Sequence, residues 1–87
     1  MVASFFVMNY CAYILFSITL GKYYIGHSSN VEKRLLHHNA SLDKFTKRGV
    51  PWVLIMSFHC HDKSSAMALE RKIKSRGAKR YLEDLGT

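Results

Sequence analysis

The sequence predicts a small α+β fold in which helices flank a three-stranded antiparallel sheet. Strand-like and helix-like segments follow one another in the order β-β-α-β-α-α, and the first two strand-like segments are joined by a short connection. The 87 residues are 48% hydrophobic, which is typical of a globular protein with one modest core. With no internal repeat and no linker-like stretch, we expect one domain over residues 1–87.

The first two strands are predicted to form a hairpin. Residues 10–17 are rich in aromatic and β-branched types, and a second strand-like segment covers residues 22–27. Residues 18–21 end in Gly21 and form the turn between them. So short a connection predicts an antiparallel pair.

A helix is predicted next, over residues 30–39. Ser29 and Glu32 match a capping box, in which the serine accepts from the Glu32 amide and the glutamate reaches back. Val31 and Leu35 are expected to face the core, with Leu36 as a further candidate.

The rest of the chain predicts one strand and two helices. A polar loop covers residues 40–51, and a third strand covers residues 52–58. Trp52 is expected in the core rather than as a base-stacking platform. The second helix is predicted to begin at a cap supplied by Asp62 or Ser64, to bury Ala66, Leu69 and Ile73, and to end near Arg76 before Gly77. A short third helix is expected over residues 79–85.

The charge of the chain predicts a polyanionic partner. There are 13 Lys and Arg against 6 Asp and Glu, a formal net charge of +7. Six of the cations fall within residues 71–80: Arg71, Lys72, Lys74, Arg76, Lys79 and Arg80. Such clustering favours a nucleic acid over an acidic protein or a membrane surface.

The two cysteines and the apolar N-terminal stretch could indicate a disulfide-rich secreted protein or a membrane protein, and the sequence argues against both. Cys11 and Cys60 are expected to be buried free thiols. The apolar stretch over residues 5–20 has no Lys or Arg before it and is too short for a bilayer span. We therefore expect a cytoplasmic protein without a membrane segment.

Several residues could carry chemistry on a phosphodiester. Tyr13 and Tyr24 fall on the two paired strands, and each alone is as easily a packing residue. Gly26 lacks a Cβ, so that a phosphate backbone could approach it closely. Arg34 and His38 are four residues apart and share one helix face, and a guanidinium matches phosphate oxygens in two-point contact.

Glu70 is the candidate metal ligand. It borders the apolar stripe of the second predicted helix, and its structural alternative is an i, i+4 ion pair with Lys74. Mg²⁺ prefers oxygen ligands and keeps several waters, so one carboxylate together with substrate phosphates can hold it.

Together these residues resemble the GIY-YIG nuclease superfamily, especially its small stand-alone members related to the N-terminal nuclease domain of excinuclease C. The YIG element is intact as Tyr24-Ile25-Gly26, and the GIY element is reduced to its tyrosine in Cys11-Ala12-Tyr13. In the resemblance the catalytic arginine falls on Arg34, the metal-binding glutamate on Glu70 and an active-site histidine on His38. His27 stands where relatives often have lysine or another polar donor. No asparagine follows Asn39, although many members have one beyond the glutamate.

The resemblance implies an endonuclease that uses Mg²⁺ or Mn²⁺ to hydrolyse DNA phosphodiesters, in a setting such as repair or recombination. Tyr13 is then the base and Tyr24 orients the water or phosphate, although these roles could be exchanged. Arg34 would stabilise the transition state, with His38 and His27 as donors or proton relays. The alternative is a weak or inactive nucleic-acid-binding module of the same fold. RNA is not excluded as a substrate, and a partner protein could supply specificity.

Further residues are expected to hold phosphates without reading base sequence. They are Gly26, Lys44, Lys47, Arg48, Arg71 and Lys74.

Overall fold

A computed structural model of the chain describes residues 10–86. Its sheet consists of β1 (Tyr10–Ser17), β2 (Lys22–Ser28) and β3 (Trp52–Cys60). The strand order is β2-β1-β3, and β1 is antiparallel to both of its neighbours. The predicted hairpin and three-stranded sheet are therefore confirmed.

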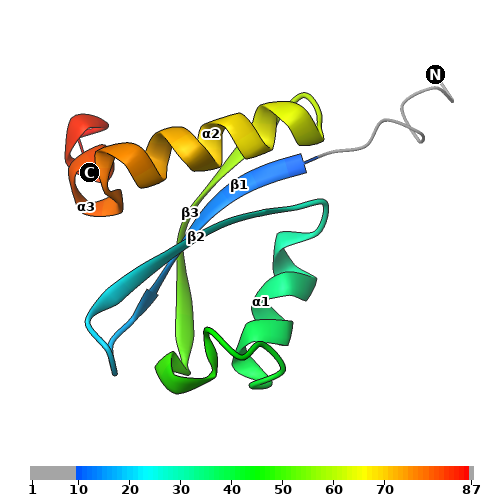
Figure 1. Cartoon of the computed structure of the whole chain (residues 1–87), viewed down its shortest axis with the longest axis vertical. Coiled ribbons are helices and arrows are strands. Elements are labelled where there is room, and N and C mark those ends of the chain that lie inside the picture. Colours follow the sequence, from blue (N-terminus) through cyan, green and yellow to red (C-terminus); the bar gives the residue numbers. More distant parts are fainter. Residues whose placement is uncertain (1–9, 87) are drawn as a thin grey trace, which may run out of the picture.

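The three α-helices cover both faces of the sheet. They are α1 (Val31–Asn39), α2 (Lys63–Arg76) and α3 (Ala78–Asp84), and a short 3₁₀ turn, η2 (Lys47–Gly49), lies between α1 and β3. In Figure 1, α2 and α3 lie on one side of the sheet and α1 lies on the other. This arrangement confirms the predicted α+β class.

Alternation along β1 explains why two small cores form. Ala12 and Ile14 are fully buried in one cluster with Ile73 of α2 and residues of α3. Tyr13 and Leu15 point to the opposite face, where partly buried α1 residues pack against them. The central strand thus supplies both cores, and its tyrosine faces α1.

Three predictions about the elements need correction. The cap of α1 is Asn30, whose side chain accepts from the Lys33 amide, so the capping box at Ser29 is wrong. Leu36 is 72% exposed and does not reach the core, because it lies outside the buried face of α1. The buried residue of this helix is His38. Strand β3 continues two residues beyond the predicted end, since Cys60 pairs with Tyr10 of the central strand.

The predicted cap of α2 and the predicted burial of Trp52 are confirmed. Asp62 caps α2 by accepting from the Ser65 amide. Trp52 is buried in the core. Both cysteines are free thiols, but only Cys60 is buried, whereas Cys11 is half-buried. Within residues 10–86 the chain has no helix with the length and apolar character that crossing a bilayer requires.

Candidate active site

The site begins with a cross-strand pair in the hairpin. Tyr13 of β1 lies directly opposite Gly26 of β2, so that both face α1. A Cβ placed on Gly26 would lie 2.6 Å from the Tyr13 hydroxyl oxygen. The room that glycine leaves is therefore filled by the phenol of Tyr13, which reaches across the edge strand. Close approach of a phosphate to Gly26 stays a prediction.

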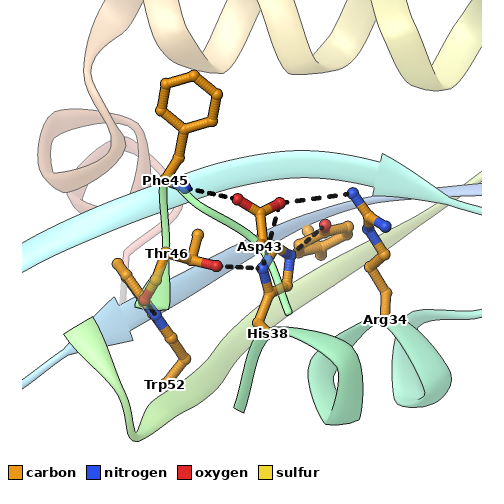
Figure 2. A network of polar contacts seen from close by, with 7 residues as sticks. Arg34, His38, Asp43, Phe45, Thr46 and Trp52 are labelled. Atoms are coloured by element: carbon orange, nitrogen blue, oxygen red, sulfur yellow. Dashed lines mark hydrogen bonds and ion pairs between the residues drawn. The ribbon is translucent and has the colours of Figure 1, made fainter. Parts of the chain in front are cut away.

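The phenol of Tyr13 belongs to a buried chain of hydrogen bonds. Its hydroxyl lies 3.2 Å from Nε2 of His38, and Nδ1 of the same ring lies 2.8 Å from Oγ1 of Thr46. His38 and Thr46 are fully buried, and Tyr13 is only 1% exposed. Figure 2 shows His38 between α1 and the loop that carries Thr46. Polar groups so deeply buried are stable only when they are hydrogen-bonded.

Arg34 adds a donor beside the Tyr13 oxygen. A guanidinium can only donate, and its interaction with the phenol oxygen acts to lower the pKa of Tyr13. The direction of the hydrogen bond between Tyr13 and Nε2 of His38 depends on which ring nitrogen carries the proton. A neutral ring that accepts at Nε2 carries its proton on Nδ1 and donates it to Thr46. The network therefore runs from Arg34 through Tyr13 and His38 to Thr46.

The electrostatics of this side favour neutral groups. Burial, followed by the neighbouring Arg34 charge, lowers the pKa of His38 below its ordinary value of 6.5. Burial is also the main reason why the pKa of Tyr13 rises to about 12, against the opposing hydrogen bond from Arg34. At neutral pH the imidazole is therefore uncharged, and the phenol keeps its proton.

Tyr24 stands beside this chain and has some access to solvent. Its ring packs edge-on against His38, with ring centroids 4.9 Å apart, and it is partly buried. Burial raises the pKa of Tyr24, and the negative charge of Asp43 adds to that effect. The two site tyrosines thus differ in exposure, with Tyr24 as the more accessible phenol.

The loop after α1 braces the histidine. Oδ2 of Asp43 lies 4.0 Å from both the Arg34 guanidinium and Nδ1 of His38. Asn39 bonds both the amide and the carbonyl of Trp52, which ties the end of α1 to the start of β3. The Trp52 indole donates to the Thr46 carbonyl over 2.7 Å. These bonds fix the segment that holds Thr46 against His38.

The carboxylate of Glu70 lies on the other side of β2. His27 is opposite Ala12 in the register and so faces α2, where its Nδ1 lies 2.6 Å from Oε1 of Glu70. Lys74 donates to Oε2 over 2.6 Å, which is the i, i+4 pair foreseen as the structural alternative. Burial acts to raise the pKa of Glu70, but the hydrogen bonds from Lys74 and His27 outweigh it, so the net pKa is lowered.

The charge of Glu70 nevertheless affects the two tyrosines on the α1 side. The negative charge of Glu70 adds to burial in raising the pKa of both Tyr13 and Tyr24. Glu70 therefore acts on both phenols electrostatically, while its own contacts are with His27 and Lys74 on the α2 side.

The donor set fits a metal held by one protein carboxylate. Within residues 10–86, no three His, Cys, Asp or Glu residues lie together as a protein-only metal site. Glu70 is ionised, and Lys74, which holds Oε2, is itself 54% exposed and able to swing away. Such a carboxylate suits Mg²⁺, which takes few protein ligands and completes its shell with water and phosphate.

A basic pocket adjoins Arg34. It has a volume of about 180 Å³ and is lined by Ser28, Ser29, Asn30, Lys33, Arg34 and His37. The other predicted phosphate-binding cations are exposed: Lys44, Lys47 and Arg48 around η2, and Arg71 and Lys74 on α2. Cations therefore lie on both the α1 side and the α2 side.

The structure thus brings together four of the predicted catalytic residues: Tyr13, Tyr24, Arg34 and His38. Of the two predicted histidines, His38 is hydrogen-bonded to Tyr13, whereas His27 contacts Glu70. Asp43 and Thr46 are not predicted from the sequence. Both lie in an irregular polar loop, where no periodicity predicts which side chains turn inward.

The family comparison agrees with this geometry. A model of the GIY-YIG catalytic domain matches residues 9–82. The chain belongs to the GIY-YIG family. This family is one of nucleases, and its domain covers both the tyrosine pair and Glu70.

Two proteins are similar to this GIY-YIG domain in sequence or in structure. The UPF0213 protein HQ_3675A of Haloquadratum walsbyi is 37% identical over 67 residues, which cover 74% of this chain and 75% of the relative. The NMR structure of the UPF0213 protein BH0048 from Bacillus halodurans is similar with a TM-score of 0.55 and 25% identity. That match covers 91% of this chain and 84% of the other. The chain is therefore similar to small proteins of the UPF0213 group.

Proposed function

We propose that the protein is a divalent-metal-dependent endonuclease that hydrolyses phosphodiester bonds in DNA. The single observation that carries the proposal is the buried 3.2 Å hydrogen bond between the Tyr13 hydroxyl and Nε2 of His38, with Arg34 beside the phenol. In the tautomer that carries its proton on Nδ1, the neutral imidazole accepts from the phenol, and the pair is arranged to pass a proton.

In the proposed reaction, Tyr13 gains one proton and gives up another. As the attacking water gives a proton to the Tyr13 oxygen, the phenol releases its own proton to Nε2 of His38. The resulting imidazolium is stabilised by Thr46 at Nδ1 and by the Asp43 carboxylate 4.0 Å away. Tyr24, which is more accessible, orients the water or the phosphate.

Arg34 and Glu70 supply the electrostatic part. Arg34 stabilises the negative charge that grows on the phosphate oxygens, and removal of one such donor typically costs about 10²–10³ in kcat. Glu70 would hold Mg²⁺ or Mn²⁺, which supplies charge neutralisation at the phosphate when it is bound. Lys74, once it leaves Glu70, is available to the DNA backbone.

A second candidate function is a nucleic-acid-binding module without effective catalysis. It is favoured by one observation, that both oxygens of Glu70 are engaged by His27 and Lys74 in the free protein. In that case the carboxylate is a structural ion pair, and the basic surface binds phosphates only.

The experiment incubates the purified protein with supercoiled, branched and flapped DNA, in Mg²⁺, in Mn²⁺ and in chelator. The nuclease proposal expects metal-dependent nicking of at least one substrate and a loss of about 10²-fold or more in Arg34→Ala. Lys22→Ala, at the exposed start of β2, serves as the control. Binding of all substrates without nicking in either metal would replace the nuclease by the binding module. A parallel RNA panel decides between the two nucleic acids.

A further inference from the structure

The side chain of Phe45 is unusually exposed for a phenylalanine. It is 90% exposed, more than any other large hydrophobic side chain within residues 10–86. In Figure 2 its ring points away from Thr46 and Trp52 rather than into the core. A ring in this position adds little to the packing of the fold and is accessible to a ligand.

The backbone that carries this ring is held firmly. The Phe45 amide donates to Oδ1 of Asp43 over 2.8 Å, which closes a local turn. The next residue, Thr46, is fully buried and bonded to His38 and to the indole of Trp52. The ring is therefore presented from a fixed point, one residue away from the group that braces the candidate proton acceptor.

The charges around the ring indicate what it meets. Lys44 precedes it, and Lys47 and Arg48 follow it, all three exposed. Aromatic rings interleaved with cations are the usual equipment for unpaired nucleic acid, because the cations follow the backbone while bases stack on the rings. Protein interfaces are depleted in lysine, so the two lysines beside Phe45 favour a nucleic acid over a protein partner.

We propose that Phe45 stacks on an unpaired nucleobase next to the phosphate that Arg34 contacts. The inference rests on the proposed function, and it names the substrate class as DNA with unstacked bases beside the cut, such as a flap or a branch. Bases within a continuous duplex have both faces covered by their neighbours. The ring can therefore stack only where pairing is interrupted.

The test measures binding in chelator, so that cleavage does not enter the signal. A flapped DNA carries the fluorescent base 2-aminopurine at the first unpaired position, where stacking on an aromatic ring quenches it. Wild type should quench the probe, and Phe45→Ala should lose the quenching and roughly 5- to 150-fold in affinity for the flap. Phe45→Trp should keep both, because it preserves an aromatic face.

Two controls sharpen the result. Leu42→Ala removes another exposed apolar side chain of the same loop, 67% exposed, and should leave flap binding unchanged. A fully paired duplex should bind wild type and Phe45→Ala equally. Since the ring is outside the core, both variants should unfold at the temperature of wild type.

Three outcomes would overturn the proposal. One is equal flap binding by wild type and Phe45→Ala. Another is full quenching by Phe45→Leu, which keeps apolar volume but no ring. The third is a change in self-association of Phe45→Ala with flap binding unaltered, which would make the ring a protein contact. If Phe45-dependent quenching persists in a protein that nicks no DNA in metal, the nuclease proposal fails while the stacking stands.

Discussion

The two sides of strand β2 hold their polar groups in opposite ways. On the α1 side, Tyr13, His38 and Thr46 are buried, neutral and joined by hydrogen bonds. On the α2 side, Glu70 is ionised, partly exposed and paired with His27 and Lys74. The fully buried polar groups are thus neutral, whereas the ionised groups keep some access to water: Glu70 on the α2 side, and Arg34 and Asp43 at the edge of the α1 side.

This difference suggests a division of labour at the site. The α1 side, with the buried Tyr13, His38 and Thr46, is called the dry side here, and it is suited to passing a proton between neutral groups without losing it to solvent. The α2 side, with Glu70, His27 and Lys74, is called the wet side. There a metal cation can replace the Lys74 ammonium at Glu70, since Lys74 is 54% exposed and its ion pair is weak. Variants that damage one side alone can show whether the two sides act separately.

The largest effect on nicking is expected from Gly26→Ala, which alters the packing of the dry side. The new Cβ would lie 2.6 Å from the Tyr13 hydroxyl oxygen and 2.7 Å from its Cζ, so the buried phenol must move off His38. We expect nicking to fall by about 10²-fold or more, as for loss of a proton-transfer group. Overpacking should lower the free energy of unfolding by about 1–3 kcal/mol.

Its companion is the double variant Gly26→Ala with Tyr13→Phe, which removes the hydroxyl that clashes. It should recover part of the lost stability and none of the activity. Normal nicking by Gly26→Ala with an intact fold would contradict a role for the Tyr13–His38 bond.

A smaller effect is expected from pH, again on the dry side. The pKa of His38 is lowered in the folded protein, so below its ordinary value of 6.5 the unfolded chain binds a proton that the folded chain refuses. The free energy of unfolding should therefore fall as pH drops from 7 to 5, by at most about 1.4 kcal/mol per pH unit from this group. The lowered pKa of Glu70 adds its own loss only at lower pH, below its ordinary value of 4.5.

Urea unfolding at each pH measures this dependence. His38→Gln should flatten it, whereas His61→Gln, at an exposed position, should not. Titration of the His38 ring by NMR provides a check that needs no variant, and a midpoint above 6.5 would contradict the buried neutral ring.

The smallest effect is expected from Lys74→Met on the wet side. Loss of one exposed i, i+4 ion pair should change the free energy of unfolding by no more than about 0.5 kcal/mol. Release of Oε2 of Glu70 should lower the Mg²⁺ concentration needed for half-maximal nicking. Lys72→Met on the same helix is the control, and a raised Mg²⁺ requirement in Lys74→Met would contradict competition between lysine and metal.

The parts of the molecule that the sequence predicts well are those with local signals. The short turn at Gly21 predicts the hairpin, and Asp62 predicts the start of α2. The cap of the first helix is harder to predict because Ser29 and Asn30 are both good caps, and only the structure shows that Asn30 is used. Leu36 satisfies helical periodicity yet is exposed, since α1 turns His38 inward instead.

The site was predictable only in part, for a similar reason. The tyrosines, Arg34 and Glu70 carry recognisable spacing, but Thr46 and Asp43 act through long-range contacts of an irregular loop. Nor does the register of the hairpin reveal on which side of β2 each group falls until the α1 and α2 faces are known. The sequence therefore indicates the chemistry, whereas the separation of a dry side from a wet side emerges only in three dimensions.

We expect phosphodiester cleavage to need both sides of β2, and substitution of Glu70 separates the contribution of the α2 side. The measurement is the single-turnover cleavage rate of a flapped DNA across a Mg²⁺ titration, for wild type, Glu70→Gln and the control Glu32→Gln from the exposed face of α1. We expect metal-dependent cleavage by wild type and by Glu32→Gln, and none above the chelator background by Glu70→Gln at any Mg²⁺ concentration. Cleavage by Glu70→Gln at the wild-type rate would contradict it.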